Sequence, residues 1–134
     1  MNGIRIREEV PLIPQPQDST SGADPRIRLH ELRNELVAEL ESASQALTAM
    51  RALRADRSDD DEHDPEGAPL SAEWSRLDRV HRAAQKRVQD VDDALRAVEA
   101  GRYGRCSRCR EPIAPGRLEF MPAADRCVRC AGRR

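Results

Sequence analysis

Two segments of the chain repeat apolar residues at the three- and four-residue spacing of an amphipathic helix. The first begins at Asp24, which can cap the free backbone N–H groups, with Pro25 at the favoured first position. Its apolar positions are Leu29, Leu32, Leu36, Leu40, Ala43, Leu47, Met50 and Leu53. We expect the second helix to begin at Ser71, another good cap, and to stop at Gly101. Its seam positions are Trp74, Leu77, His81, Ala84, Val88, Val91, Leu95 and Val98. Each segment predicts a helix of roughly 45 Å, at 1.5 Å per residue.

The connection between these helices, residues 58–70 (SDDDEHDPEGAPL), holds two prolines and a glycine and predicts a turn. An antiparallel helical hairpin would bury both apolar stripes, and the strict three–four alternation of the second stripe is typical of a coiled-coil seam. Pairing between two chains is the alternative, but the connection is short enough to pair the helices within one chain. His81 on the seam predicts a hydrogen-bonded polar position that fixes the register, and Trp74 is expected to pack over the hairpin end.

The remaining segments complete the predicted organisation. Residues 1–23 are rich in proline, serine and glycine and predict a disordered N-terminal segment. The chain has 134 residues, 35% of them charged and only 2% aromatic, which disfavours a broad globular core. We therefore predict a mainly α protein: a long antiparallel coiled-coil hairpin over residues 24–100 and a zinc finger over residues 101–134. No signal peptide or transmembrane run is visible, so we expect a soluble, cytoplasmic protein without membrane contact.

Charge is unevenly distributed although the formal net charge is only −1. Residues 56–66 contain seven acidic residues and one arginine, whereas residues 101–134 contain nine arginines and three acidic residues. Solvated chain ends explain such runs in most proteins, so charge alone identifies no partner.

Four cysteines carry the clearest chemistry in the sequence. Cys106 and Cys109 form one Cys-x2-Cys pair, and Cys127 and Cys130 form a second pair seventeen residues later. Paired thiolates at this spacing suit one tetrahedral Zn²⁺, and thiols stay reduced in the cytoplasm. Four protein ligands leave no open position, so the predicted zinc ion is structural and not catalytic. A thiol redox switch and an iron–sulfur site are the alternatives for the same residues.

The loop between the two cysteine pairs is punctuated by turn residues and contains a few apolar side chains. We expect four of these to form a small cluster beneath the metal: Ile113, Leu118, Phe120 and Met121.

The stretch from Tyr103 to Cys130 resembles the DksA/TraR zinc-finger family. The matching features are Tyr-Gly before the first cysteine pair, an Ile in the loop, Arg-Leu-Glu, a Pro and the closing cysteine pair. They fall at Tyr103, Gly104, Ile113, Arg117, Leu118, Glu119 and Pro122. A preceding helical hairpin, as predicted here, extends the resemblance over most of the chain.

This resemblance implies a transcription regulator that binds bacterial RNA polymerase and does not read DNA. Such proteins insert the coiled-coil tip into the secondary channel of the polymerase, and acidic residues at the tip are the working residues. The acidic tip residues of this chain are Asp59, Asp60, Asp61, Glu62, Asp64 and Glu66. Aligned on its Asp-Pro, the chain matches the first Asp of the family tip at Asp64, but Gly67 replaces the second Asp and Pro69 replaces an Ala.

Other functions are weighed against this one. The cysteine spacing also resembles that of GATA-type fingers, but such fingers need a helix and a basic tail after the second cysteine pair, and only residues 131–134 follow it. A thiol redox sensor that releases zinc on oxidation can coexist with polymerase binding. We find no nucleophile–base arrangement, phosphate loop or open metal position, so neither an enzyme nor a small-molecule substrate is expected.

Overall fold

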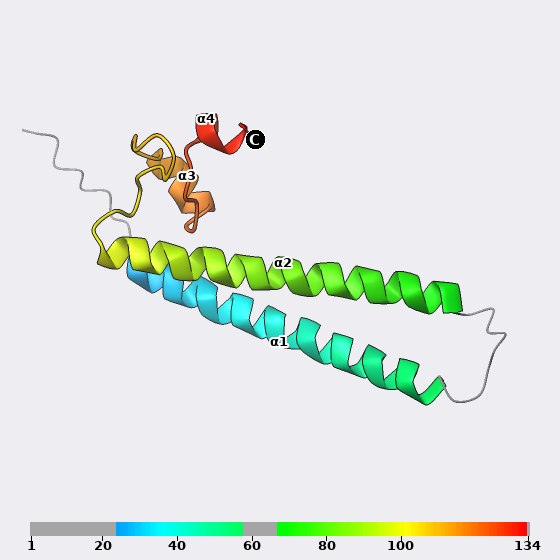
Figure 1. Cartoon of the computed structure of the whole chain (residues 1–134). Helices are drawn as coiled ribbons and strands as arrows, with labels where there is room; N and C mark the ends of the chain where they lie inside the picture. Colours follow the sequence, from blue (N-terminus) through cyan, green and yellow to red (C-terminus); the bar gives the residue numbers. More distant parts are fainter. Residues whose placement is uncertain (1–23, 58–66, 134) are drawn as a thin grey trace, which may run out of the picture.

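The computed structural model describes residues 24–57 and 67–133, and these residues are mainly helical. Two long helices, α1 (Pro25–Arg57) and α2 (Gly67–Glu99), run antiparallel beside each other (Figure 1). The predicted hairpin is therefore confirmed, and the two apolar stripes meet within one chain.

The C-terminal residues fold beside the end of the hairpin at which α2 finishes (Figure 1). They contain two short helices, α3 (Pro115–Phe120) and α4 (Val128–Ala131). The described residues form no strand, only an isolated antiparallel bridge between Arg105 and Pro112. The predicted fold class, a mainly α chain that ends in a four-cysteine cluster, is confirmed.

Both outer ends of the hairpin follow the signals in the sequence. The backbone N–H of Arg26 donates to the Asp24 carboxylate at 3.0 Å, which is the predicted cap of α1. Gly101 has a left-handed backbone with φ of 65°, and the N–H of Arg102 donates back to the Ala97 carbonyl at 2.8 Å. This pairing satisfies a carbonyl that the helix end would otherwise leave free, so Gly101 ends α2 as predicted.

The predicted start of α2 is wrong by one turn. The helix begins at Gly67 and not at Ser71, so the last residues of the expected turn are helical. Pro69 is compatible with this because backbone N–H groups in a first helical turn have no partner within the helix. Residues 58–66, with the acidic tip residues, lie outside the described residues.

The apolar stripes of the two helices form the hairpin core. The buried core residues on the two helices are Leu29, Leu36, Ala43, Leu47, Met50, Ala84, Val91 and Ala94. Leu53 is an exception to the prediction, since its side chain is 57% exposed. The helices diverge toward this end in Figure 1, and there the half-buried Trp74 lies beneath the guanidinium groups of Arg51 and Arg54, 5.4 and 5.5 Å from its ring centre.

Polar pairs between the helices fix their register. The three cross-helix pairs are Arg33–Asp92 at 2.6 Å, Glu39–Arg87 at 2.5 Å and Ser44–His81 at 3.1 Å. Partner numbers fall along α2 as they rise along α1, which is one antiparallel register without slippage. The His81 ring meets the Ser44 hydroxyl through Nε2, so the predicted hydrogen-bonded seam position is confirmed.

The C-terminal module is attached to the base of the hairpin by apolar and polar contacts. Tyr103 and Ala123 pack against the core cluster of the hairpin. The Tyr103 hydroxyl donates to the Pro122 carbonyl at 2.8 Å, and the Arg28 guanidinium of α1 donates to the Glu119 carbonyl at 2.7 Å. These contacts join the first turn of α1 to the segment around α3.

Two sequence predictions concern parts that this description leaves open. Residues 1–23, which the sequence predicts to be disordered, lie outside the described residues, and the division into a hairpin (24–100) and a finger (101–134) stays a prediction. Within the described ranges, no helix combines the length and the apolarity needed to cross a bilayer.

Candidate metal centre

The first cysteine pair lies in a tight backbone turn. The N–H of Cys106 donates to the Glu111 carbonyl at 2.9 Å, and the N–H of Arg110 donates to the Cys106 carbonyl at 3.0 Å. These two bonds fold the chain back on itself, so that Cys106 and Cys109 are presented on the same side of the turn.

Two residues around this turn have left-handed backbones. Gly104 has φ of 80°, and a Cβ there would lie 3.6 Å from the Leu118 side chain, so backbone conformation rather than space favours glycine. Arg110 has φ of 66°, which is costly for a residue with a side chain. The turn after Cys109 therefore holds an arginine in a conformation better suited to glycine.

The second cysteine pair is held by the start of α4. Cys127 precedes the helix, and its carbonyl accepts the N–H of Cys130 at 3.1 Å. Ser107 joins the two pairs: its N–H donates to the Asp125 carbonyl at 2.7 Å, and its hydroxyl donates to the Asp125 carboxylate at 3.0 Å. These two hydrogen bonds bring residues eighteen positions apart into one site.

The four sulfur atoms form one compact cluster. The Sγ atoms of Cys106, Cys109, Cys127 and Cys130 all lie within 4.8 Å of one another, and none of the four is in a disulfide. Cys109 and Cys127 are 3.7 Å apart at Sγ. Tetrahedral zinc with Zn–S bonds of about 2.3 Å separates its sulfur ligands by about 3.8 Å, so the cluster has the size that one zinc ion requires.

The comparisons with known proteins point to one family. Residues 101–134 match the family model of the prokaryotic DksA/TraR C4-type zinc finger. The C-terminal module therefore carries a zinc finger of the DksA/TraR type. Among solved structures, the transcription factor DksA2 from Pseudomonas aeruginosa matches with a TM-score of 0.64 and 26% identity, over 80% of this chain and 77% of that one. A search of curated proteins gave no match.

The DksA2 match extends well beyond the finger, because 80% of this chain cannot be covered without the hairpin. The family resemblance inferred from Tyr103 to Cys130 is thus confirmed, and both findings support a DksA-like transcription regulator. As a C4 zinc finger with four close cysteines, the chain can hold one metal ion.

The thiols of the DksA/TraR finger differ in acidity before metal is added. Backbone N–H groups of Cys109 and then Cys127 stabilise the Cys106 thiolate and lower its pKa to about 6. Burial raises the pKa of Cys130 to about 12. Since a metal-bound cysteine is a thiolate, metal binding must displace the proton of Cys130, whereas Cys106 is largely ionised at neutral pH.

The apolar cluster of the DksA/TraR finger is only partly as predicted. Ile113 is buried with Cys106 and Cys130, and Leu118 packs against them. The prediction was wrong for Phe120 and Met121, whose side chains are 89% and 52% exposed. Phe120 follows Leu118 by two residues and so lies on the opposite side of α3, whereas Met121 lies beyond the end of this helix.

Three polar residues have roles at the site that were not predicted. Ser107 and Asp125 join the cysteine pairs, and the Arg117 guanidinium donates to the Arg126 carbonyl at 3.0 Å, next to the second pair. Arg117 was named only as part of the Arg-Leu-Glu feature of the family, whereas serine and aspartate are common on solvated surfaces, so Ser107 and Asp125 carried no signal.

Proposed function

We propose that this chain regulates transcription by binding bacterial RNA polymerase through the acidic end of its hairpin, without reading DNA. The observation that carries the proposal is the joint match of hairpin and finger to the transcription factor DksA2. The family resemblance supports insertion of the hairpin end into the secondary channel of the polymerase.

The hairpin has a form suited to this role. Its two helices have 33 residues each, so each spans roughly 50 Å at 1.5 Å per residue. The acidic segment 58–66 is joined to the ends of α1 and α2 that lie farthest from the finger (Figure 1). Carboxylates carried into a channel can alter the water network of a divalent ion or meet basic groups that bind nucleotide phosphates.

We propose that Cys106, Cys109, Cys127 and Cys130 together bind one structural zinc ion. The sulfur separations support this set. Four protein ligands leave no position for substrate, and the family and its structural neighbour are transcription factors, so we propose a regulator without enzymatic activity or a small-molecule substrate. We further propose a cytoplasmic location, where bacterial RNA polymerase acts.

Binding to core polymerase tests the tip. We expect a variant with Asp59→Ala, Asp60→Ala and Asp61→Ala to lose most of its retention on immobilised core polymerase, because the carboxylates of the inserted end are gone. The matched control removes three exposed carboxylates from the side of α1: Glu31→Ala, Glu35→Ala and Glu41→Ala. Equal retention of the tip variant and the wild type would refute the proposed tip contact.

Direct DNA binding of the GATA type is the competing function. A salt series on DNA binding separates the two: phosphate contacts would give a steep loss of affinity with rising salt. We expect no specific binding at physiological salt. The redox alternative concerns the same cysteines, and a peroxide titration with a zinc reporter would detect metal release.

A further inference from the structure

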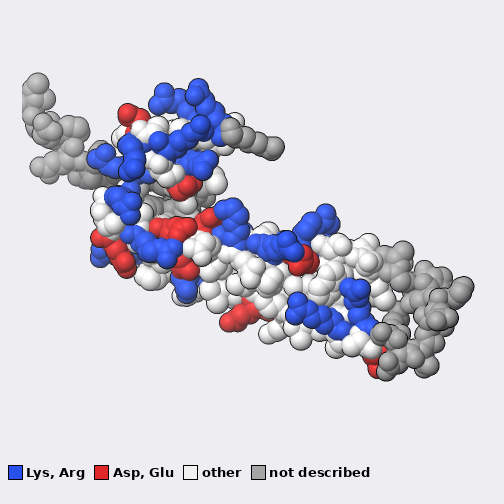
Figure 2. All heavy atoms as spheres, in the orientation of Figure 1, with Lys and Arg blue, Asp and Glu red and all other residues white. Residues whose placement is uncertain are grey.

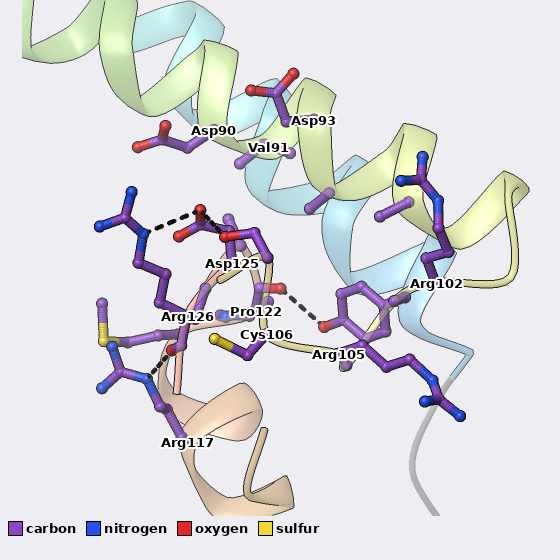
Figure 3. Close-up of a pocket in the computed structure, with 18 of the residues that line it drawn as sticks. Asp90, Val91, Asp93, Arg102, Arg105, Cys106, Arg117, Pro122, Asp125 and Arg126 are labelled. Carbon is purple, nitrogen blue, oxygen red and sulfur yellow. Dashed lines mark hydrogen bonds and ion pairs between the residues drawn. The ribbon is translucent and has the colours of Figure 1, made fainter. Parts of the chain in front are cut away.

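A positively lined groove separates the finger from α2. It has a volume of about 1030 Å³, and its walls are the Lys86–Ala97 stretch of α2 and the finger. Phe120 and Met121, the two exposed apolar residues of the finger loop, are part of its lining. In Figure 3 the side chains of Arg102 and Arg105 lie at one end of the groove and those of Arg117 and Arg126 at the other.

Several cations of this groove already have a carboxylate partner. The paired cations are Lys86 with Asp90, Arg87 with Glu39, Arg96 with Asp93 and Arg126 with Asp125. Arg102, Arg105 and Arg110, called the groove arginines below, pair with no carboxylate among the residues that the structure describes. All three side chains are exposed and make no hydrogen bond within those residues, so their charges are directed to solvent.

The strained backbone of Arg110 adds to this picture. A left-handed conformation is retained with an arginine where glycine would be less strained. The Arg110 side chain has no ion-pair or hydrogen-bond partner among the described residues, so it is available for a contact outside the finger.

The two ends of the molecule carry opposite charge. Residues 101–133 contain eight arginines and three acidic residues. This excess exceeds the charge of about −2 that four thiolates and one Zn²⁺ carry together. Figure 2 shows Lys and Arg gathered over the finger on the face in view. Residues 58–66, joined to the opposite end of the hairpin, contain six acidic residues and neither lysine nor arginine.

The acidic segment cannot reach the groove of its own chain. From Gly67 to Asp90, α2 extends over roughly 35 Å at 1.5 Å per residue. A nine-residue segment whose two ends are both held at the hairpin end can fold back by at most about 15 Å. Any contact between the acidic segment and the groove must therefore join two molecules.

We propose that two copies of this chain pair antiparallel, with the acidic segment 58–66 of each copy in the arginine-lined groove of the other. Each molecule carries one acidic segment and one groove at opposite ends of a rod, so a two-fold dimer occupies both grooves and closes the assembly. Charge pairing orients the two rods, and the exposed Phe120 and Met121 add apolar contact area.

This inference does not rest on the polymerase proposal, because it concerns the purified protein alone. It has a consequence for any use of the acidic segment: the dimer covers that segment, so a partner that binds it must compete with the second copy.

Sedimentation velocity of the full, zinc-loaded protein tests the pairing. We expect dimers at tens of micromolar protein in 50 mM salt, and an apparent dissociation constant at least tenfold higher in 300 mM salt, where screening shortens the reach of the charges. A wild-type protein that stays monomeric at 200 µM in 50 mM salt would overturn the proposal. So would larger assemblies that grow with concentration, because the proposed dimer is closed.

Charge reversal identifies the surfaces. The groove variant carries Arg102→Glu, Arg105→Glu and Arg110→Glu, and we expect its dissociation constant to rise at least tenfold. The control reverses three exposed arginines that lie outside the groove and have no ion pair among the described residues: Arg26→Glu, Arg79→Glu and Arg129→Glu. An equal weakening in this control would reduce the effect to net charge and overturn the assignment of the groove.

A mixture of two variants gives the most specific result. A tip variant with Asp59→Lys, Asp60→Lys, Asp61→Lys, Glu62→Lys and Asp64→Lys should also be monomeric alone, because its tip and groove are both basic. Mixed with the groove variant, in which both are acidic, it should form a heterodimer in 50 mM salt. Two variants that stay monomeric together, or a wild type that binds single-stranded DNA in the groove instead of a second copy, would overturn the pairing.

Discussion

The hairpin and the finger are stabilised by different means. Along the hairpin, apolar side chains are buried at intervals from Leu29 to Ala94, and ion pairs such as Arg33–Asp92 join the helices. The finger has helices of six and four residues, and its buried cluster consists of two cysteines and Ile113. The buried apolar residues between Leu29 and Met50 and between Ala84 and Ala94 can therefore support the hairpin, whereas the finger needs its metal ion.

Removal of zinc should have the largest effect, and it should affect the finger far more than the hairpin. Structural zinc supplies about 10–16 kcal/mol in small fingers, more than the buried cluster of this finger can replace. We expect a chelator to unfold residues 102–130 and to leave most of the helical signal, because α1 and α2 have 33 residues each. Circular dichroism and amide hydrogen exchange measure both effects.

A substitution of one ligand is the counterpart of chelation. Cys106→Ser should give the same loss of protection in the finger, whereas Ser107→Ala, which removes only the hydroxyl bond to Asp125, should retain zinc. Persistent protection of the finger amides without metal would contradict the proposed dependence.

A cavity in the hairpin core should destabilise the hairpin and leave the zinc content of the finger unchanged. Leu36 is 2% exposed, and Leu36→Ala should lower the free energy of unfolding of the hairpin by about 3 kcal/mol. Its control, Leu53→Ala, removes the same atoms from a side chain that is 57% exposed and should cost well under half as much. Urea unfolding measures the difference, and comparable zinc content in both variants would show that the finger is spared.

The same contrast explains what could be predicted from the sequence. Helix periodicity and the Asp24 and Gly101 signals depend on local chemistry, so the hairpin and its outer ends were predicted closely. The start of α2 was not, because proline is read as a helix breaker although Pro69 fits a first turn. The cysteine spacing predicted four residues whose sulfur atoms lie close together in the structure, as the ligands of one metal ion must.

Side-chain direction in the finger was beyond sequence reasoning. Phe120 and Met121 are apolar and were expected inside, but Phe120 lies on the outer side of a six-residue helix and Met121 follows its end, and periodicity cannot be read over such a length. The contact of Arg28 with the Glu119 carbonyl joins residues 91 positions apart, and no local pattern encodes it.

A third variant concerns the joint between the two regions. Tyr103→Phe removes the hydroxyl that donates to the Pro122 carbonyl and keeps the ring against the hairpin core. We expect a loss of about 1 kcal/mol, typical of one hydrogen bond. Zinc affinity should be unchanged, because the hydroxyl does not touch a cysteine, and hydrogen exchange around Ala123 should rise. A large fall in zinc affinity would instead make Tyr103 part of the metal site's support.

The smallest effect concerns the backbone of the finger itself. Arg110 has φ of 66°, a conformation that costs a non-glycine residue about 1–2 kcal/mol. Arg110→Gly should relieve this strain, but glycine loses about 0.5–1 kcal/mol more backbone entropy on folding, so the net gain in stability should be below about 1 kcal/mol. Arg110→Ala is the matched control, because it removes the side chain and keeps the strain. Thermal unfolding of the zinc-loaded protein at high salt, where charge contacts are screened, compares the three proteins. A gain for glycine but not for alanine assigns the effect to the backbone; equal gains would assign it to repulsion among the arginines and would contradict strain at this turn.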